Sequence, residues 1–126
     1  MRDIDKIPVM RVGDNLLVSI QVDMTDEMAG QLQSDILDQI IVTGARGVLI
    51  DISALDMLDS FLARNFSETA KMTTVMDADA VIVGMQPAIA LTLVELGLEL
   101  KEIHTALDVD RGVELLELLK NKALEI

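Results

Sequence analysis

The stretch from Gly47 to Phe66, GVLIDISALDMLDSFLARNF, contains the strand, turn and helix around which the chain is arranged. Its first six residues, 47–52, are apolar apart from Asp51, which is typical of a strand covered on both faces. A polar turn follows, and an amphipathic helix is predicted from about Ser60 to Met76. A strand that runs through a turn into a helix indicates an α/β protein. At the junction lie a carboxylate, a hydroxyl and an aromatic ring, from Asp59, Ser60 and Phe61.

Upstream of this stretch the sequence predicts a β-hairpin and a first helix. Two apolar runs, Ile7–Val12 and Leu16–Ile20, flank the turn sequence Gly-Asp-Asn at 13–15. Pro8 cannot donate a backbone hydrogen bond, so the first strand is expected at an edge of the sheet. A helix is predicted over 25–44, because it begins with a capping Thr, ends with Gly and carries apolar residues four apart: Met28, Leu32, Ile36 and Ile40.

Downstream of the stretch, strands alternate with helices. Strands are predicted at Ala80–Gly84 and Leu100–Thr105, and helices from Pro87 to Gly97 and from Asp108 through Leu119. The order is β-β-α-β-α-β-α-β-α, which requires a mixed, mostly parallel sheet with right-handed crossovers. Such sheets bind their ligands and partners beyond the carboxyl ends of the strands. The turn at Asp56–Ser60 lies at one of these ends.

The composition fits one domain and argues against nucleic acid and anionic membranes as partners. The 126 residues predict a single domain, 1–126, with its core at about 6–119 and a short tail at 120–126. With 10 basic residues, 22 acidic residues and 2% aromatic residues, the chain lacks the groups that bind nucleic acid or anionic membranes. The apolar fraction of 51% and the mean hydropathy of +0.41 indicate either a Leu/Ile-rich core or apolar surface buried against other chains.

The sequence carries no motif for catalysis or cofactor binding. It has no Cys and one His, His104, which we expect to be at the surface or half-buried; zinc sites of the Cys/His type are thereby excluded. Gly-rich nucleotide-binding motifs are also missing. Asp51, Asp56 and Asp59 leave open a weak Mg²⁺ site or a phospho-acceptor carboxylate. The simpler interpretation is that these carboxylates solvate the turn and favour the helix N-terminus. We expect a protein that is not an enzyme and binds no cofactor and no metal.

The location of the protein is predicted from the N-terminus and from the most apolar window of the chain. The N-terminus, MRDIDKIPV, lacks the apolar core of a signal peptide. The most apolar window, Ala80–Leu98, is interrupted by Gln, Pro and Glu and is not expected to span a bilayer. We therefore expect a soluble, cytoplasmic protein.

Ser60 has two interpretations, as a helix cap or as a phospho-acceptor. If Asp59 caps the helix instead, the Ser60 hydroxyl is free, and we favour this arrangement because a kinase needs an uncommitted hydroxyl. A phosphate adds about −1.5 to −2 charges, which the helix N-terminus stabilises and nearby Asp side chains repel. Phe61 is placed to contact a docked partner. The other hydroxyls are expected to be less accessible, at the end of a buried strand or inside the helix: Ser53, Ser67 and Thr69.

Three stretches together resemble the STAS domain and, within that family, the RsbS-type scaffold proteins of the bacterial stressosome. They are Leu16–Gln21 (LLVSIQ), Asp56–Phe61 (DMLDSF) and Gly84–Ala88 (GMQPA). The likeness extends from Lys6 to Leu119. It implies a single STAS domain with an N-terminal β-hairpin, a mostly parallel sheet and four helices. Simple anti-sigma-factor antagonists usually carry a small residue and Gly after the phospho-acceptor, where this chain has Phe61-Leu62.

The resemblance implies a switch at Ser60, which an RsbT-type Ser/Thr kinase phosphorylates and an RsbX-type phosphatase dephosphorylates. The chain would form homo- and hetero-oligomers and co-assemble with RsbR-type STAS proteins into a large particle. This particle would hold the kinase and release it after phosphorylation, regulating the general stress response. The kinase-binding turn would comprise Asp56, Asp59 and Phe61. A stand-alone anti-sigma-factor antagonist, acting as a monomer or dimer, is the alternative, and a small metal-dependent phosphotransfer domain is a third. The mass of the purified complex separates the first two.

Overall fold

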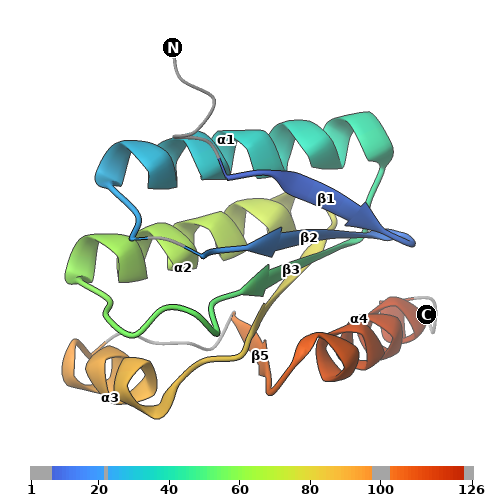
Figure 1. The fold of residues 1–126 in the computed structure, drawn as a ribbon. Helices are drawn as coiled ribbons and strands as arrows, with labels where there is room; N and C mark the ends of the chain where they lie inside the picture. Colours follow the sequence, from blue (N-terminus) through green and yellow to red (C-terminus); the bar gives the residue numbers. More distant parts are fainter. Residues whose placement is uncertain (1–6, 22, 98–102, 124–126) are drawn as a thin grey trace.

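The computed structural model of the chain describes residues 7–21, 23–97 and 103–123. The described elements follow the predicted order, β-β-α-β-α-β-α-β-α (Figure 1). In chain order they are β1 (Val9–Val12), β2 (Asn15–Ser19), α1 (Asp26–Thr43), β3 (Gly47–Asp51), α2 (Ser60–Val75), β4 (Asp79–Val83), α3 (Pro87–Glu95), β5 (His104–Ala106) and α4 (Val109–Ala123).

The five strands form one mixed sheet in the order β1-β2-β3-β4-β5. β1 is antiparallel to β2, and every other neighbouring pair is parallel. The prediction of a hairpin with β1 at the sheet edge is confirmed. Gly13, with a φ of 62°, occupies the first position of a two-residue turn between Val12 and Asn15, where a left-handed conformation suits the twist of a hairpin.

Helices cover the two faces of the sheet unequally. Apolar residues of α1, α2 and α3 pack with Val48, Ile50 and Ile82 into one large core. On the other face α4 lies alone and buries Leu116 against alternate residues of β3 and β4, including Leu49 and Val81. Figure 1 shows α4 set apart from α1 and α2 across the sheet. The continuous apolar runs of β3 and β4 therefore result from burial on both faces.

Capping residues fix the predicted helix ends. The Thr25 hydroxyl accepts a hydrogen bond from the Met28 N–H at 3.1 Å, and Gly44, with a φ of 69°, closes α1 by donating to the Ile40 carbonyl at 2.8 Å. The Asp108 carboxylate accepts from the Arg111 N–H at 2.9 Å at the start of α4. These three predicted caps are confirmed.

Two boundaries near the C-terminus differ in detail from the sequence predictions. β5 begins at His104, and the residues 100–102 of the predicted strand lie outside the described part of the chain. α4 continues past Leu119 to Ala123, so the first residues of the predicted tail are helical. Lys120 on this last turn lies 3.4 Å from Asp14, measured from Nζ to Oδ2, which ties α4 to the hairpin turn. Within the described residues no helix is long and apolar enough to cross a membrane.

Candidate functional site

The loop that joins β3 to α2 is held at three points by buried side chains. Ile52, Leu55 and Leu58 are each buried in the core, at intervals of three residues. The Leu55 N–H also donates to the Ile52 carbonyl at 2.9 Å, which closes a tight turn. Between these points the polar residues and Met57 remain exposed to solvent. The loop is therefore anchored to the sheet although most of its surface is free to meet a partner.

The next loop, which joins β4 to α3, packs against the first. The Gln86 side chain donates to the Ser53 carbonyl at 2.8 Å. Gly84 has a φ of 75°, and a Cβ placed there would lie 2.7 Å from the Ser53 Cβ. Only a residue without a side chain allows so close an approach. The Asp51 carboxylate accepts from the Ser53 N–H at 2.9 Å within the first loop. The Gln86 hydrogen bond therefore joins the two loops just beyond the carboxyl ends of their strands.

The prediction for Ser53 is wrong. Ser53 was expected at the end of a buried strand, but β3 ends at Asp51 and Ser53 is exposed. The strand stops early because the Asp51 carboxylate binds the Ser53 N–H and turns the chain away from the sheet. Ser53 therefore belongs to the loop surface, two residues after the strand.

The first residue of α2, Ser60, has a free hydroxyl. The Asp59 carboxylate caps the helix, because it accepts a hydrogen bond from the Leu62 N–H at 2.8 Å and its backbone is extended, with φ −92° and ψ 173°. Ser60 is exposed, and its hydroxyl makes no hydrogen bond to any other described residue. The prediction that Asp59 caps α2 is confirmed.

The other hydroxyls on α2 are less available. Thr69 is buried, and its hydroxyl donates to the Asn65 carbonyl at 2.8 Å and accepts from the Gln33 side chain at 3.0 Å. Ser67 is half-buried two residues earlier, on a different side of the helix. Ser60, the first residue of α2, therefore has a more accessible hydroxyl than Ser67 or Thr69.

Two apolar side chains flank Ser60 on the molecular surface. Phe61 is 45% exposed and Met57 is 78% exposed. Asp56 is exposed between Leu55 and Met57. The sequence analysis selected Phe61 and Asp56 but overlooked Met57. In the sequence Met57 stands between Asp56 and the apolar Leu58, and no local signal shows that only Leu58 of this apolar pair is buried.

The Asp cluster does not form a metal site among the described residues. The carboxylates of Asp51 and Asp59 each accept a backbone N–H, from Ser53 and Leu62 respectively. Across residues 7–21, 23–97 and 103–123, no group of three or more His, Asp or Glu side chains is arranged to hold a metal ion. The interpretation that these carboxylates solvate the turn and favour the helix N-terminus fits their observed partners.

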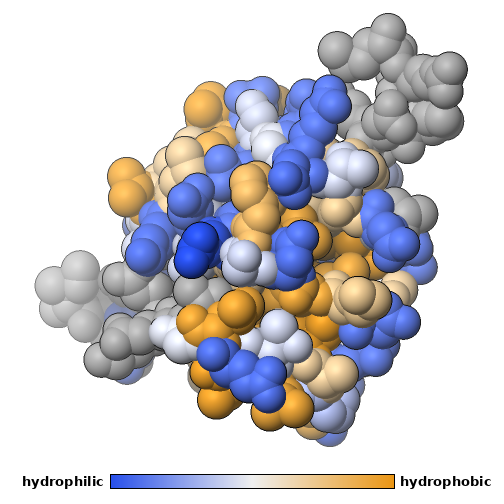
Figure 2. Space-filling model, turned by 90° about the vertical axis from the view of Figure 1, so that its left-hand side faces the viewer, coloured by the Kyte–Doolittle hydropathy of each residue, from blue (hydrophilic) through white to orange (hydrophobic). Residues whose placement is uncertain are grey.

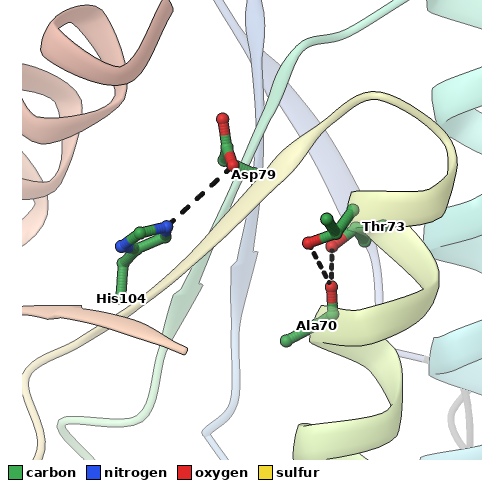
Figure 3. A network of polar contacts seen from close by, with 5 residues as sticks. Ala70, Thr73, Asp79 and His104 are labelled. Atoms are coloured by element: carbon green, nitrogen blue, oxygen red, sulfur yellow. Dashed lines mark hydrogen bonds and ion pairs between the residues drawn. The ribbon is translucent and has the colours of Figure 1, made fainter. Parts of the chain in front are cut away.

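His104 lies at the opposite end of the sheet from Ser60. It is half-buried, as predicted, and its Nε2 atom is 3.9 Å from the Asp79 Oδ1 atom on the neighbouring strand β4 (Figure 3). Figure 3 also shows Thr73 on α2, whose buried hydroxyl donates to the Ala70 carbonyl at 2.7 Å. His104 therefore faces the Asp79 carboxylate, and the Thr73 hydroxyl is hydrogen-bonded within α2.

Comparison with known proteins gives a consistent family assignment. The sequence profile of the STAS domain matches residues 6–112. The RsbT co-antagonist protein RsbRA of Bacillus subtilis (strain 168) is 26% identical over 108 residues, which cover 85% of this chain. The chain spans only 39% of that relative's length.

Two solved structures resemble the chain along almost their whole length. An RsbS protein of Moorella thermoacetica, carrying a serine-to-glutamate substitution, has a TM-score of 0.80 and is 32% identical, covering 91% of this chain and 97% of that one. A chain in the solved molecular architecture of the stressosome, a signal integration and transduction hub, has a TM-score of 0.75 and is also 32% identical. That match covers 90% of this chain and 98% of the other.

Proposed function

Because this chain belongs to the STAS-domain family, we propose that it acts as a non-enzymatic, RsbS-like scaffold of a cytoplasmic stressosome. The likeness to RsbS covers 97% of that protein at 32% identity, whereas the likeness to RsbRA covers 39% of its length. A relative matched from end to end supports the proposal better than one matched in part. The fold contributes a platform, and the loop before α2 contributes the contact with a regulatory enzyme.

The observation that carries the proposal is the free hydroxyl of Ser60. Asp59 caps the helix by accepting the Leu62 N–H, so the Ser60 hydroxyl is not needed as the cap and is open to modification. The proposed modification is phosphorylation by an RsbT-type kinase, which an RsbX-type phosphatase reverses. A phosphoryl group at this position would face the N–H groups at the start of α2, which stabilise negative charge.

Phosphorylation would act on the docked kinase rather than on the fold. Ser60 is exposed, so the added charge stays in water and the domain remains folded. The kinase would contact Met57 and Phe61, the two apolar residues beside Ser60. About −1.5 to −2 additional charges next to Asp56 and Asp59 would alter this surface strongly. The kinase held on the unmodified scaffold is released when the surface changes.

Assembly with RsbR-type STAS proteins is the second part of the proposal. RsbRA is named as a co-antagonist of RsbT, and it is 26% identical to this chain over 108 residues, so its matching region is proposed to be a STAS domain as well. Two STAS proteins of one fold offer similar surfaces and so suit a mixed particle. In this arrangement the chain supplies the switch and its partner supplies further domains.

The experiment compares kinase retention by wild-type and Ser60→Ala particles. The chain is mixed with an RsbR-type partner and an RsbT-type kinase, Mg-ATP is added, and kinase that co-sediments with the particle is measured. We expect wild type to release the kinase and Ser60→Ala to retain it. Ser67→Ala is the matched control and should behave as wild type. Release from Ser60→Ala at the wild-type rate would contradict the proposed switch.

Ser60→Asp is expected to mimic phosphorylation poorly. Aspartate supplies one negative charge, whereas phosphate supplies nearly two and has more acceptor oxygens. In the same co-sedimentation assay without ATP, Ser60→Asp should retain more kinase than the phosphorylated wild type.

A further inference from the structure

Ser53 and Ser60 are both exposed on the same side of the molecule. Ser53 follows β3, and Ser60 begins α2. The loop after β3 and the start of α2 both lie on the left of Figure 1, and Figure 2 turns this side towards the viewer. Polar and apolar side chains stand next to one another over this surface (Figure 2). A kinase docked here would find both hydroxyls exposed, so exposure alone does not select Ser60.

The backbone of Ser53 is bound on both sides by side chains. Its N–H donates to the Asp51 carboxylate at 2.9 Å, and its carbonyl accepts from the Gln86 amide at 2.8 Å. Gly84 lies against the same residue, since a Cβ at position 84 would come within 2.7 Å of the Ser53 Cβ and 3.2 Å of its Cα. We call these three residues, Asp51, Gly84 and Gln86, the Ser53 clamp. Ser53 cannot leave its place without losing these contacts.

The backbone of Ser60 is held less firmly. Its N–H is one of the first in α2, which have no acceptor within the helix, and it donates to no other described residue. The ends of helices also fray. In phosphoryl transfer the serine oxygen bonds to the γ-phosphorus of ATP, the hydroxyl proton passes to a base of the kinase, and ADP leaves. The serine must move close to the phosphate for this step, which costs Ser60 less than Ser53.

Gln86 serves the clamp rather than its own helix. It occupies the N-cap position of α3, but its side chain makes no capping hydrogen bond. The amide instead reaches Ser53, 33 residues earlier in the chain. Ile52 and Leu55 hold the loop by burial, which has no preferred direction. A hydrogen bond is directional, so Gln86 fixes the position of the Ser53 carbonyl.

We propose that the Ser53 clamp directs phosphorylation to Ser60 by withholding Ser53 from the kinase, with Gln86 as the positioning residue. This inference rests on the proposed function, because it requires a kinase that acts on this side of the molecule. The kinase would use Ser53 only in the fraction of molecules in which the clamp is open, and a small open fraction lowers its apparent affinity in proportion. Loss of the Gln86 hydrogen bond would raise that fraction.

The first test measures hydrogen exchange of the Ser53 amide in the isolated chain, without a kinase. Gln86→Met removes the donor but keeps a long side chain, so exchange should be about 3- to 10-fold faster, the effect of one net hydrogen bond. Gln86→Glu keeps the shape, but a carboxylate cannot donate, so exchange should again be faster. A residue that only filled space would tolerate this substitution. Gln31→Met is the matched control, since Gln31 donates over the same 2.8 Å to Asp35 within α1.

The second test locates the phosphate by peptide fragmentation after incubation with an RsbT-type kinase and Mg-ATP. Wild type and Gln31→Met should carry phosphate on Ser60 and none on Ser53. In Gln86→Met and Gln86→Glu, Ser53 should become a second acceptor. Ser60 should still be phosphorylated at close to the wild-type rate, because Asp59 and the start of α2 keep their contacts.

Two results would overturn the inference: exchange of the Ser53 amide that Gln86→Met leaves unchanged, or phosphate that stays confined to Ser60 in both Gln86 variants. A wild-type chain that gains no phosphate on Ser60 would instead contradict the proposed function. Faster exchange in the Gln86 variants would still support the clamp in that case, because the exchange test contains no kinase.

Discussion

Asp59 and Ser60 are neighbours with different effects on stability. The Asp59 carboxylate holds the Leu62 N–H, whereas the Ser60 hydroxyl holds no described group. We therefore expect Asp59→Ala to lower the free energy of unfolding by about 0.5–2 kcal/mol, the usual cost of losing an N-cap. Ser60→Ala should leave the melting temperature almost unchanged. Thermal unfolding of both variants checks this, and a larger loss for Ser60→Ala than for Asp59→Ala would show that the roles are reversed.

Gly84 is expected to be one of the least replaceable residues of the site. Its φ of 75° and the 2.7 Å between an added Cβ and the Ser53 Cβ both oppose a side chain. Gly84→Ala should cost about 1–2 kcal/mol from the left-handed conformation alone, with more from the displaced loop. Gly30→Ala is the matched control: Gly30 lies in α1 with open space around it, so Ala should stabilise the helix by about 0.5–1 kcal/mol. Equal stability of the two variants in denaturant unfolding would contradict this account.

Among the elements, α4 needs a glycine at position 112 for its close contact with the sheet. A Cβ at Gly112 would lie 2.6 Å from Leu49 Cδ2 and 2.8 Å from Val83 Cγ1, and both of these residues are fully buried. Gly112→Val should overpack this face and lower stability by about 1–3 kcal/mol. Glu114→Val places the same residue at an exposed position of α4 and should cost much less. Urea unfolding of the two variants measures the difference, and equal midpoints would show that α4 is not held this way.

The sequence predicted the order of the elements because periodicity and caps are local signals. Thr25, Gly44 and Asp108 act within their own helices, and each was assigned correctly. The packing of the two loops was not predicted, because the contact between Gln86 and Ser53 joins residues 33 apart in the chain. Ser53 was misplaced because nothing in the sequence shows that Asp51 turns toward the backbone. Exposure of Met57 likewise depends on how Leu55 and Leu58 anchor the loop.

For the whole molecule, the size of the complex separates the two candidate functions. A scaffold mixed with an RsbR-type partner should elute from a size-exclusion column near the void volume. A stand-alone anti-sigma-factor antagonist should remain a monomer or dimer under the same conditions. Light scattering gives the mass directly. A mixture in which no species is heavier than a dimer would favour the stand-alone antagonist.

The most direct test of the central claim is to locate the phosphate after incubation with an RsbT-type kinase and Mg-ATP. Intact mass spectrometry should show one phosphate on the wild-type chain and none on Ser60→Ala. Peptide fragmentation should place it on Ser60, because this exposed hydroxyl has no described hydrogen-bond partner and lies at a helix N-terminus. Ser53 is the critical comparison, since it is also exposed in the same loop. Phosphate found mainly on Ser53, or undiminished in Ser60→Ala, would contradict the account.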